Sequence, residues 1–221
     1  MIKQMNHFMD MDDEFLTLES ARYVLLTVPY DGTSTFVKGA DKGPQAILNA
    51  SDSLELYDVQ YECEACNAGI YTDHHNYDFT TPDTMVQSVY DRVRHYQQMG
   101  KQIAMIGGEH SVSVGAIKAM SEQYKNLTVL QIDAHADLRD DYHNSIYNHA
   151  CVMRRAQDFA RVVQVGIRNV CTEEQHNIVP ENIFYAHHIF DNEKWMQPAL
   201  NRLTDNVYIT FDLDGLDPSI L

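Results

Sequence analysis

Short apolar runs recur along the whole chain, separated by longer polar or amphipathic segments. Runs of this length, rich in Val and Ile and without helical periodicity, are typical of buried strands. We predict strands at residues 21–30, 68–71, 102–108, 127–133, 161–167, 182–188 and 206–214.

Helices are predicted between several of these strands. Pro82 and Gly100 are typical of a helix start and stop, and a Gly-Pro turn precedes another helix. The predicted helices cover residues 43–57, 82–99, 111–124 and 149–159. Strands that alternate with helices predict a parallel sheet covered on both faces. We expect one three-layer α/β/α domain, with a mostly parallel central sheet, over residues 1–221.

One predicted strand ends in unusual chemistry. In the stretch QIDAHADLRDD, residues 131–141, acid, imidazole and acid follow the apolar run at every second position. Side chains at that spacing leave an extended chain on the same side. Asp133, His135 and Asp137 would repel one another and shift their pKa values if no cation lay between them. This spacing therefore indicates a metal site.

Two further strand ends carry similar groups. Glu109 and His110 follow residues 102–108, after two glycines that permit a tight turn. Asp212 and Asp214 end the strand at 206–214. In parallel sheets ligands bind at the carboxyl ends of the strands, so these groups are expected to converge there. The candidate metal ligands are His110, Asp133, His135, Asp137, Asp212 and Asp214.

The donor types narrow the choice of metal. The set holds four carboxylates and two imidazoles but no thiolate, which disfavours structural zinc and suits manganese. Four ionised Asp residues would balance two divalent cations. Two such cations can bind one water molecule and lower its pKa towards neutrality.

Composition limits the partners. The net charge is −16, from 16 basic and 32 acidic residues, which argues against nucleic acid or an anionic membrane surface. It is compatible with a cationic substrate, although an acidic surplus also serves solubility. The N-terminal residues carry no apolar signal core, and no apolar run approaches the roughly 20 residues that span a bilayer. Four cysteines without a signal peptide suggest a cytoplasmic protein.

Other potential metal or redox groups have simpler explanations. The Cys63–Cys66 pair lies in a polar stretch, and no second such pair completes a zinc site. The paired histidines at 74–75 and 187–188 are read as loop and strand-end residues. Cys151 and Met153 are expected in the core.

Three motifs resemble the metal-binding signatures of the ureohydrolases, the arginase and agmatinase family. They are GGEHS (107–111), DAHADLR (133–139) and FDLDGLDP (211–218), and the resemblance extends from residue 30 to the last residue. The segment NHACVMRRA, residues 148–156, and the Glu of GGEHS resemble agmatinases more than arginases. The resemblance implies an arginase-like fold, two Mn²⁺ ions and homo-oligomers, either trimers or hexamers.

The family pattern also implies roles for single residues. One manganese would be held by His110, Asp133, Asp137 and Asp212, and the other by Asp133, His135, Asp212 and Asp214. His149 matches a histidine that moves protons, and Asp137 would hold the attacking oxygen and pass on its proton. The implied reaction is hydrolysis of a small cationic guanidino substrate to urea and an amine. Agmatine, which gives putrescine for polyamine biosynthesis, is the first candidate, and guanidinobutyrate or arginine are alternatives.

Family members continue beyond the third motif, so the chain is expected to lack their C-terminal part, including a strand and a carboxylate that grips the guanidinium. That expectation leaves a second possibility, a catalytically silent member that binds metal or a partner. A third is a relative of the metal-dependent deacetylases, which use one zinc.

Overall fold

The computed structural model describes residues 6–220, which form two compact units, one up to Val112 and one from Ser113. Each unit is built on its own parallel sheet. The α/β class with mostly parallel strands is thereby confirmed, while the prediction of a single domain over 1–221 stays a prediction.

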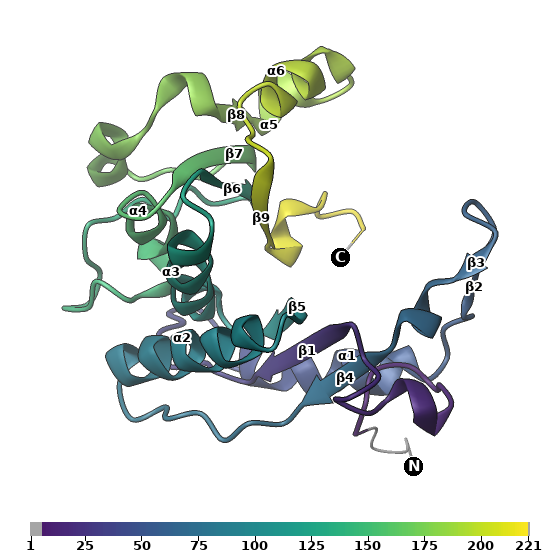
Figure 1. The fold of residues 1–221 in the computed structure, drawn as a ribbon. Helices are drawn as coiled ribbons and strands as arrows, with labels where there is room; N and C mark the ends of the chain where they lie inside the picture. The colour runs from purple at the N-terminus through teal and green to yellow at the C-terminus, as the bar shows by residue number, and fades with distance from the viewer. Residues whose placement is uncertain (1–5, 221) are drawn as a thin grey trace. The chain divides into compact units, whose positions relative to one another are not determined.

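The first unit has a three-stranded parallel sheet in the order β4-β1-β5 (Figure 1). Its central strand β1 (Tyr23–Val28) is buried along almost its whole length, as expected of a strand covered on both faces. The strands β4 (Ile70–Asp73) and β5 (Gln102–Gly107) flank it.

Two helices accompany this sheet. Helix α1 (Gly43–Ser51) buries Leu48 against Leu25 of β1. Helix α2 (Pro82–Gln98) starts with Thr81, which forms a capping box with Thr84, and it buries a stripe of residues at helical spacing. That stripe consists of Met85, Val86, Val89, Val93 and Tyr96.

Short elements complete the first unit. The strands β2 (Tyr57–Asp58) and β3 (Cys63–Glu64) form a small antiparallel pair. The 3₁₀ turns are η1 (Asp13–Phe15), η2 (Ala40–Lys42), η3 (Ala65–Ala68) and η4 (His110–Val112).

The second unit has a four-stranded parallel sheet in the order β8-β7-β6-β9 (Figure 1). Its strands are β6 (Leu127–Ile132), β7 (Arg161–Ile167), β8 (Ile183–Tyr185) and β9 (Asn206–Phe211). In this order β6 lies between β7 and β9, so the loops that follow β6 and β9 emerge side by side. The candidate site depends on that adjacency.

Helices pack on this second sheet at several points. Helix α3 (Ser113–Gln123) contacts β6 and β9, and α4 (Val152–Ala156) contacts α3 and β7. Cys151 and Met153 are fully buried, which confirms the core position predicted for them. The remaining elements are α5 (Ala186–Ile189), α6 (Met196–Leu200), η5 (His149–Cys151), η6 (Thr172–Asn177), η7 (Pro180–Asn182), η8 (Glu193–Trp195) and η9 (Leu213–Gly215).

The prediction of a strand through His187 and His188 is wrong at its end. Strand β8 stops at Tyr185, and both histidines lie in helix α5. The reason is that β8 pairs only with β7, and the pairing ends where Ile167, the last residue of β7, meets Tyr185. Within residues 6–220, no helix is long and apolar enough to cross a membrane.

Candidate metal centre

The candidate centre lies at the carboxyl ends of β6 and β9. The register pairs Ile132 with Phe211, so Asp133 and Asp212 are the next residues on two neighbouring parallel strands. The Asp212 amide donates to the Ile132 carbonyl at 2.9 Å, which continues the ladder one step past the sheet. Because neighbouring strands lie about 4.8 Å apart, the two aspartates start from adjacent backbone positions.

Asp133, His135 and Asp214 come together in the second unit. Each offers one donor atom, and the three atoms lie within 4.8 Å of one another. His135 Nδ1 is 2.9 Å from Asp214 Oδ2 and 3.8 Å from Asp133 Oδ1. Asp133 is buried, whereas the side chains of His135 and Asp214 are 48% and 44% exposed, so the cluster is open to solvent.

The close contact between His135 and Asp214 shifts the pKa values of both side chains. The hydrogen bond to Asp214 and the negative charges around it raise the pKa of His135 to about 9. The same hydrogen bond lowers the pKa of Asp214 to about 2. The hydrogen bond between His135 and Asp214 is therefore the main cause of both pKa shifts.

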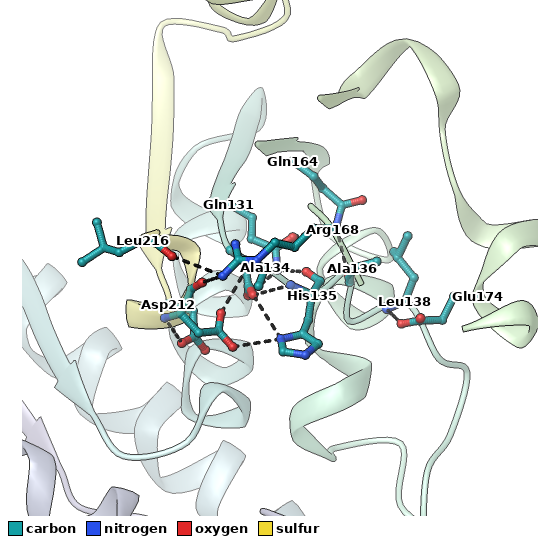
Figure 2. A network of polar contacts seen from close by, with 12 residues as sticks. Gln131, Ala134, His135, Ala136, Leu138, Gln164, Arg168, Glu174, Asp212 and Leu216 are labelled. Carbon is teal, nitrogen blue, oxygen red and sulfur yellow. Dashed lines mark hydrogen bonds and ion pairs between the residues drawn. The ribbon is translucent and has the colours of Figure 1, made fainter. Parts of the chain in front are cut away.

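Backbone contacts hold the two loops against each other. The Ala134 amide donates to Asp214 Oδ1 at 3.2 Å, and the Asp214 amide donates to Asp212 Oδ1 at 3.3 Å. The Arg168 guanidinium donates to the carbonyls of Asp214 and Leu216 (Figure 2). The η9 turn that carries Asp214 is therefore attached to β6 and to the loop after β7.

Asp137 differs from Asp133 and His135 in its backbone conformation. Its φ of 53° lies in the left-handed region, which is uncommon for residues other than glycine, although Asp adopts it more often than most. Its carbonyl accepts from the amides of Met153 and Arg154 at 2.9 and 3.1 Å, and this anchors the start of α4. The chain is not extended as far as Asp137, because β6 ends at Ile132, while the prediction that Asp133, His135 and Asp137 serve one metal centre stays a prediction.

His149 begins the η5 turn, which follows the loop after β6. The Asn148 side chain caps this turn by accepting from the Ala150 amide at 3.1 Å. The ring of His149 stands edge-on to that of Tyr142, with centroids 6.2 Å apart. The Arg139 amide donates to the Ala150 carbonyl at 3.1 Å, so the turn is attached to the chain just after Asp137.

His110 belongs to the first unit, where it opens η4 directly after β5. The neighbouring Glu109 is buried and accepts from Ser111 and Thr33, so its carboxylate braces the turn. Burial raises the pKa of Glu109. The approach of His110 to the ligands of the second unit stays a prediction.

The two glycines before Glu109 precede a bend in the chain, and Gly108 also allows a close backbone approach. Neither adopts a positive φ. Gly108 instead packs on the backbone of Tyr30, whose carbonyl oxygen would lie 2.0 Å from an added Cβ. The close approach of the loop after β1 is what excludes a side chain here.

The sequence analysis missed two buried residues beside Asp133, namely Gln131 and Gln164. Each is an amide residue inside a mostly apolar run, LTVLQI and RVVQVGI. A polar residue in a strand that is otherwise buried is the signal that could have revealed them, because buried amides need partners. Glu174 was also missed. Its carboxylate accepts from the amides of Leu138 and Cys171 at 2.8 and 2.7 Å and so braces the loop after Asp137.

The donor set fits a divalent cation. Two carboxylates and an imidazole converge without a thiolate, a donor set that suits a divalent cation such as manganese. The fold and this donor set together define an α/β protein with a candidate metal centre at its strand ends. A family model described as the Arginase family matches residues 21–221, and the chain therefore belongs to the arginase family.

Individual relatives refine this assignment. The N(1)-aminopropylagmatine ureohydrolase of Synechocystis is 36% identical, over 98% of this chain and 76% of that protein. The agmatinase of Pyrococcus horikoshii is 28% identical, over 94% of this chain and 73% of that protein. The structure of the agmatine ureohydrolase of Thermoplasma volcanium matches with a TM-score of 0.85 at 30% identity, over 99% of this chain and 74% of that one.

These matches confirm the family and the arginase-like fold predicted from the motifs. The protein is an agmatinase-like hydrolase of a metal-dependent family. The family match also decides against the deacetylase alternative.

Proposed function

We propose that this protein uses two manganese ions to hydrolyse the guanidino group of a small cationic amine, releasing urea and a primary amine. The observation that carries the proposal is the convergence of Asp133, His135 and Asp214 at the ends of β6 and β9, in a chain of the arginase family. The net charge of −16 supports a cationic substrate.

The substrate is proposed to be an aminoalkyl guanidine. The relative at 36% identity is named for N(1)-aminopropylagmatine, and the relative at 28% is named for agmatine. N(1)-aminopropylagmatine is therefore our first candidate, ahead of agmatine, whose products would be putrescine and urea. Both compounds are linear and carry cationic amines in addition to the guanidinium.

The proposed ligands are the residues that the family pattern implies. Asp133 and Asp212 would bridge the two ions, since they follow neighbouring strands directly. His135 and Asp214 would complete one coordination sphere. His110 and Asp137 would complete the other.

Asp137 and His149 would then carry out the proton transfers of the reaction. Bound divalent cations supply a water molecule that is activated as a nucleophile near neutral pH. Asp137 would accept a hydrogen bond from that water and take its proton. As the bond from the guanidinium carbon to the substituted nitrogen breaks, His149 would donate a proton to the departing amine, because an imidazole is a common general acid near neutral pH.

The test is urea release by the purified protein after loading with Mn²⁺. We expect urea from N(1)-aminopropylagmatine or agmatine, and less from arginine and guanidinobutyrate. Full metal content with no urea from any of the four guanidines would contradict the proposal and support a catalytically silent family member.

The role of His149 is tested by His149→Ala. We expect kcat to fall by about 10²- to 10⁴-fold, the usual contribution of general acid catalysis, while manganese content measured by atomic absorption is unchanged. Loss of manganese in this variant would mean that His149 is a ligand.

A further inference from the structure

Two buried glutamines lie directly beneath the candidate metal centre. Gln131 of β6 and Gln164 of β7 are register partners on adjacent strands, 0% and 4% exposed. Their neighbours Val129, Val163 and Val165 are buried apolar residues. A buried amide costs free energy unless its donors and acceptor are paired, so this pair of glutamines needs an explanation.

The two amides form a directed chain of hydrogen bonds. Gln164 Nε2 donates to Gln131 Oε1 at 2.6 Å and to the Ala136 carbonyl at 2.8 Å. Gln131 Nε2 in turn donates to Asp133 Oδ2 at 2.7 Å and to the His135 carbonyl at 3.1 Å. Figure 2 shows Gln131 and Gln164 beside each other, above the labelled loop residues Ala134, His135 and Ala136.

The direction of this chain is determined by the backbone. A carbonyl oxygen can only accept, so the atom of each glutamine that faces Ala136 or His135 must be its NH₂ group. Gln131 then has only one orientation in which it also satisfies Gln164. In that orientation an N–H of Gln131 points at the carboxylate of Asp133.

Asp133 is thereby held at both oxygens. Oδ2 accepts from Gln131, and Oδ1 accepts from the His135 amide at 2.7 Å. The carboxylate is 1% exposed, so no bulk water competes for these bonds.

We infer that Gln131 and Gln164 are positioning residues for the metal centre, which fix the rotamer and hydrogen-bonding state of Asp133 before a cation binds. This inference rests on the proposed function, since Asp133 acts as a ligand there. Gln131 orients Asp133 directly, and Gln164 acts through Gln131. Hydrogen-bond partners of metal ligands typically contribute 10- to 100-fold to metal affinity.

The test measures cation binding by the metal-free protein. Mn²⁺ binding is measured by titration calorimetry, and Co²⁺ binding is monitored by its visible absorption spectrum. Gln131→Met keeps the length of the side chain and removes its donor and acceptor. We expect about 10- to 100-fold weaker Mn²⁺ binding and a changed Co²⁺ spectrum. Gln164→Met should weaken binding less, because Gln131 keeps its bond to the His135 carbonyl.

A matched control is Gln157→Met. Gln157 is a glutamine of the second unit that is less buried than Gln131 and Gln164, and its Nε2 donates at 2.9 Å to the Asn177 carbonyl, away from the cluster. We expect its Mn²⁺ affinity and Co²⁺ spectrum to equal those of the wild type. This control separates loss of a buried amide in general from loss of the contact with Asp133.

The outcomes are distinguishable. Suppose that the wild type binds Mn²⁺, and that Gln131→Met and Gln164→Met bind it as tightly as the wild type with the same Co²⁺ spectrum. The positioning inference is then overturned, and the proposed function stands. If the wild type binds no divalent cation, the proposed function fails and the inference fails with it. If circular dichroism shows that Gln131→Met does not fold, Gln164→Met alone tests the positioning inference. Weaker Mn²⁺ binding by Gln164→Met would support the inference, and unchanged binding would overturn it.

Discussion

Asp133 illustrates how much a single residue depends on what surrounds it. Its amide donates to the Val165 carbonyl at 3.1 Å, its carboxylate is held by Gln131, and the backbone of Gly215 packs against it. The motif predicted the residue and its chemistry. Two of these partners, Val165 of β7 and Gly215 of the turn after β9, come from segments far away along the chain.

Gly215 provides a prediction at this scale. A Cβ at this position would lie 3.0 Å from the Asp133 nitrogen and 3.1 Å from its Cα, which is tighter than nine in ten Cβ contacts in proteins. We expect Gly215→Ala to lower the free energy of unfolding by about 1–3 kcal/mol, as overpacking does, because the η9 turn must move away from β6. Urea denaturation measures this loss.

The control for that prediction is Gly43→Ala. Gly43 begins α1 with a helical φ of −54°, and an added Cβ would meet only the Gly107 carbonyl, at 3.8 Å. The free energy of unfolding of Gly43→Ala should equal that of the wild type or be slightly higher. Equal stability of the two variants would contradict the close packing of Gly215 on Asp133.

At the scale of elements, the strand and helix boundaries follow mostly from local rules. Strand β7 spans the predicted residues 161–167, and α2 begins at the predicted Pro82, because capping and hydrophobic periodicity are local. The contacts between elements could not be predicted. Arg92 of α2 donates from Nε and Nη2 to the two oxygens of Asp73 at 2.7 and 2.6 Å, and thereby ties the helix to the end of β4.

This ion pair is tested by Arg92→Met. The Asp73 side chain is 4% exposed, so the variant leaves a buried carboxylate without its cation. We expect a loss of about 3 kcal/mol in the free energy of unfolding, measured by denaturant titration. The double variant Arg92→Met, Asp73→Asn should recover part of it, because no charge is then left unpaired.

Gln87→Met is the matched control on the same helix. Gln87 makes an exposed side-chain bond to Asp91, one turn further along α2. Substitutions of this kind change stability by about 0.5 kcal/mol or less. If Arg92→Met loses no more free energy of unfolding than this control, the Arg92–Asp73 ion pair does not stabilise the packing of α2 on β4.

For the molecule as a whole, the acidic balance and the metal centre are linked. A chain with a net charge of −16 that also crowds carboxylates at one set of strand ends is stabilised by anything that neutralises them. A cation that binds only the folded state raises stability by about 2.7 kcal/mol at a concentration 100 times its dissociation constant.

We therefore expect EDTA to lower the melting temperature and excess Mn²⁺ to raise it, as measured by differential scanning calorimetry. In Asp214→Asn the rise should be much smaller, because one carboxylate of the cluster is lost. Identical melting temperatures with EDTA and with excess Mn²⁺ would rule out a cation site that is coupled to folding.

The sequence by itself determined the class of fold, most strand and helix positions and the residue types of a metal centre, since these depend on local periodicity and on motifs of a few residues. The tertiary structure alone decided that β6 lies between β7 and β9 and that Gln164 reaches Asp133 through Gln131. It also decided that α5 follows β8 at Tyr185. The physical reason is that strand neighbours are chosen by the burial of whole surfaces, and the partners of a side chain come from segments that no local pattern relates.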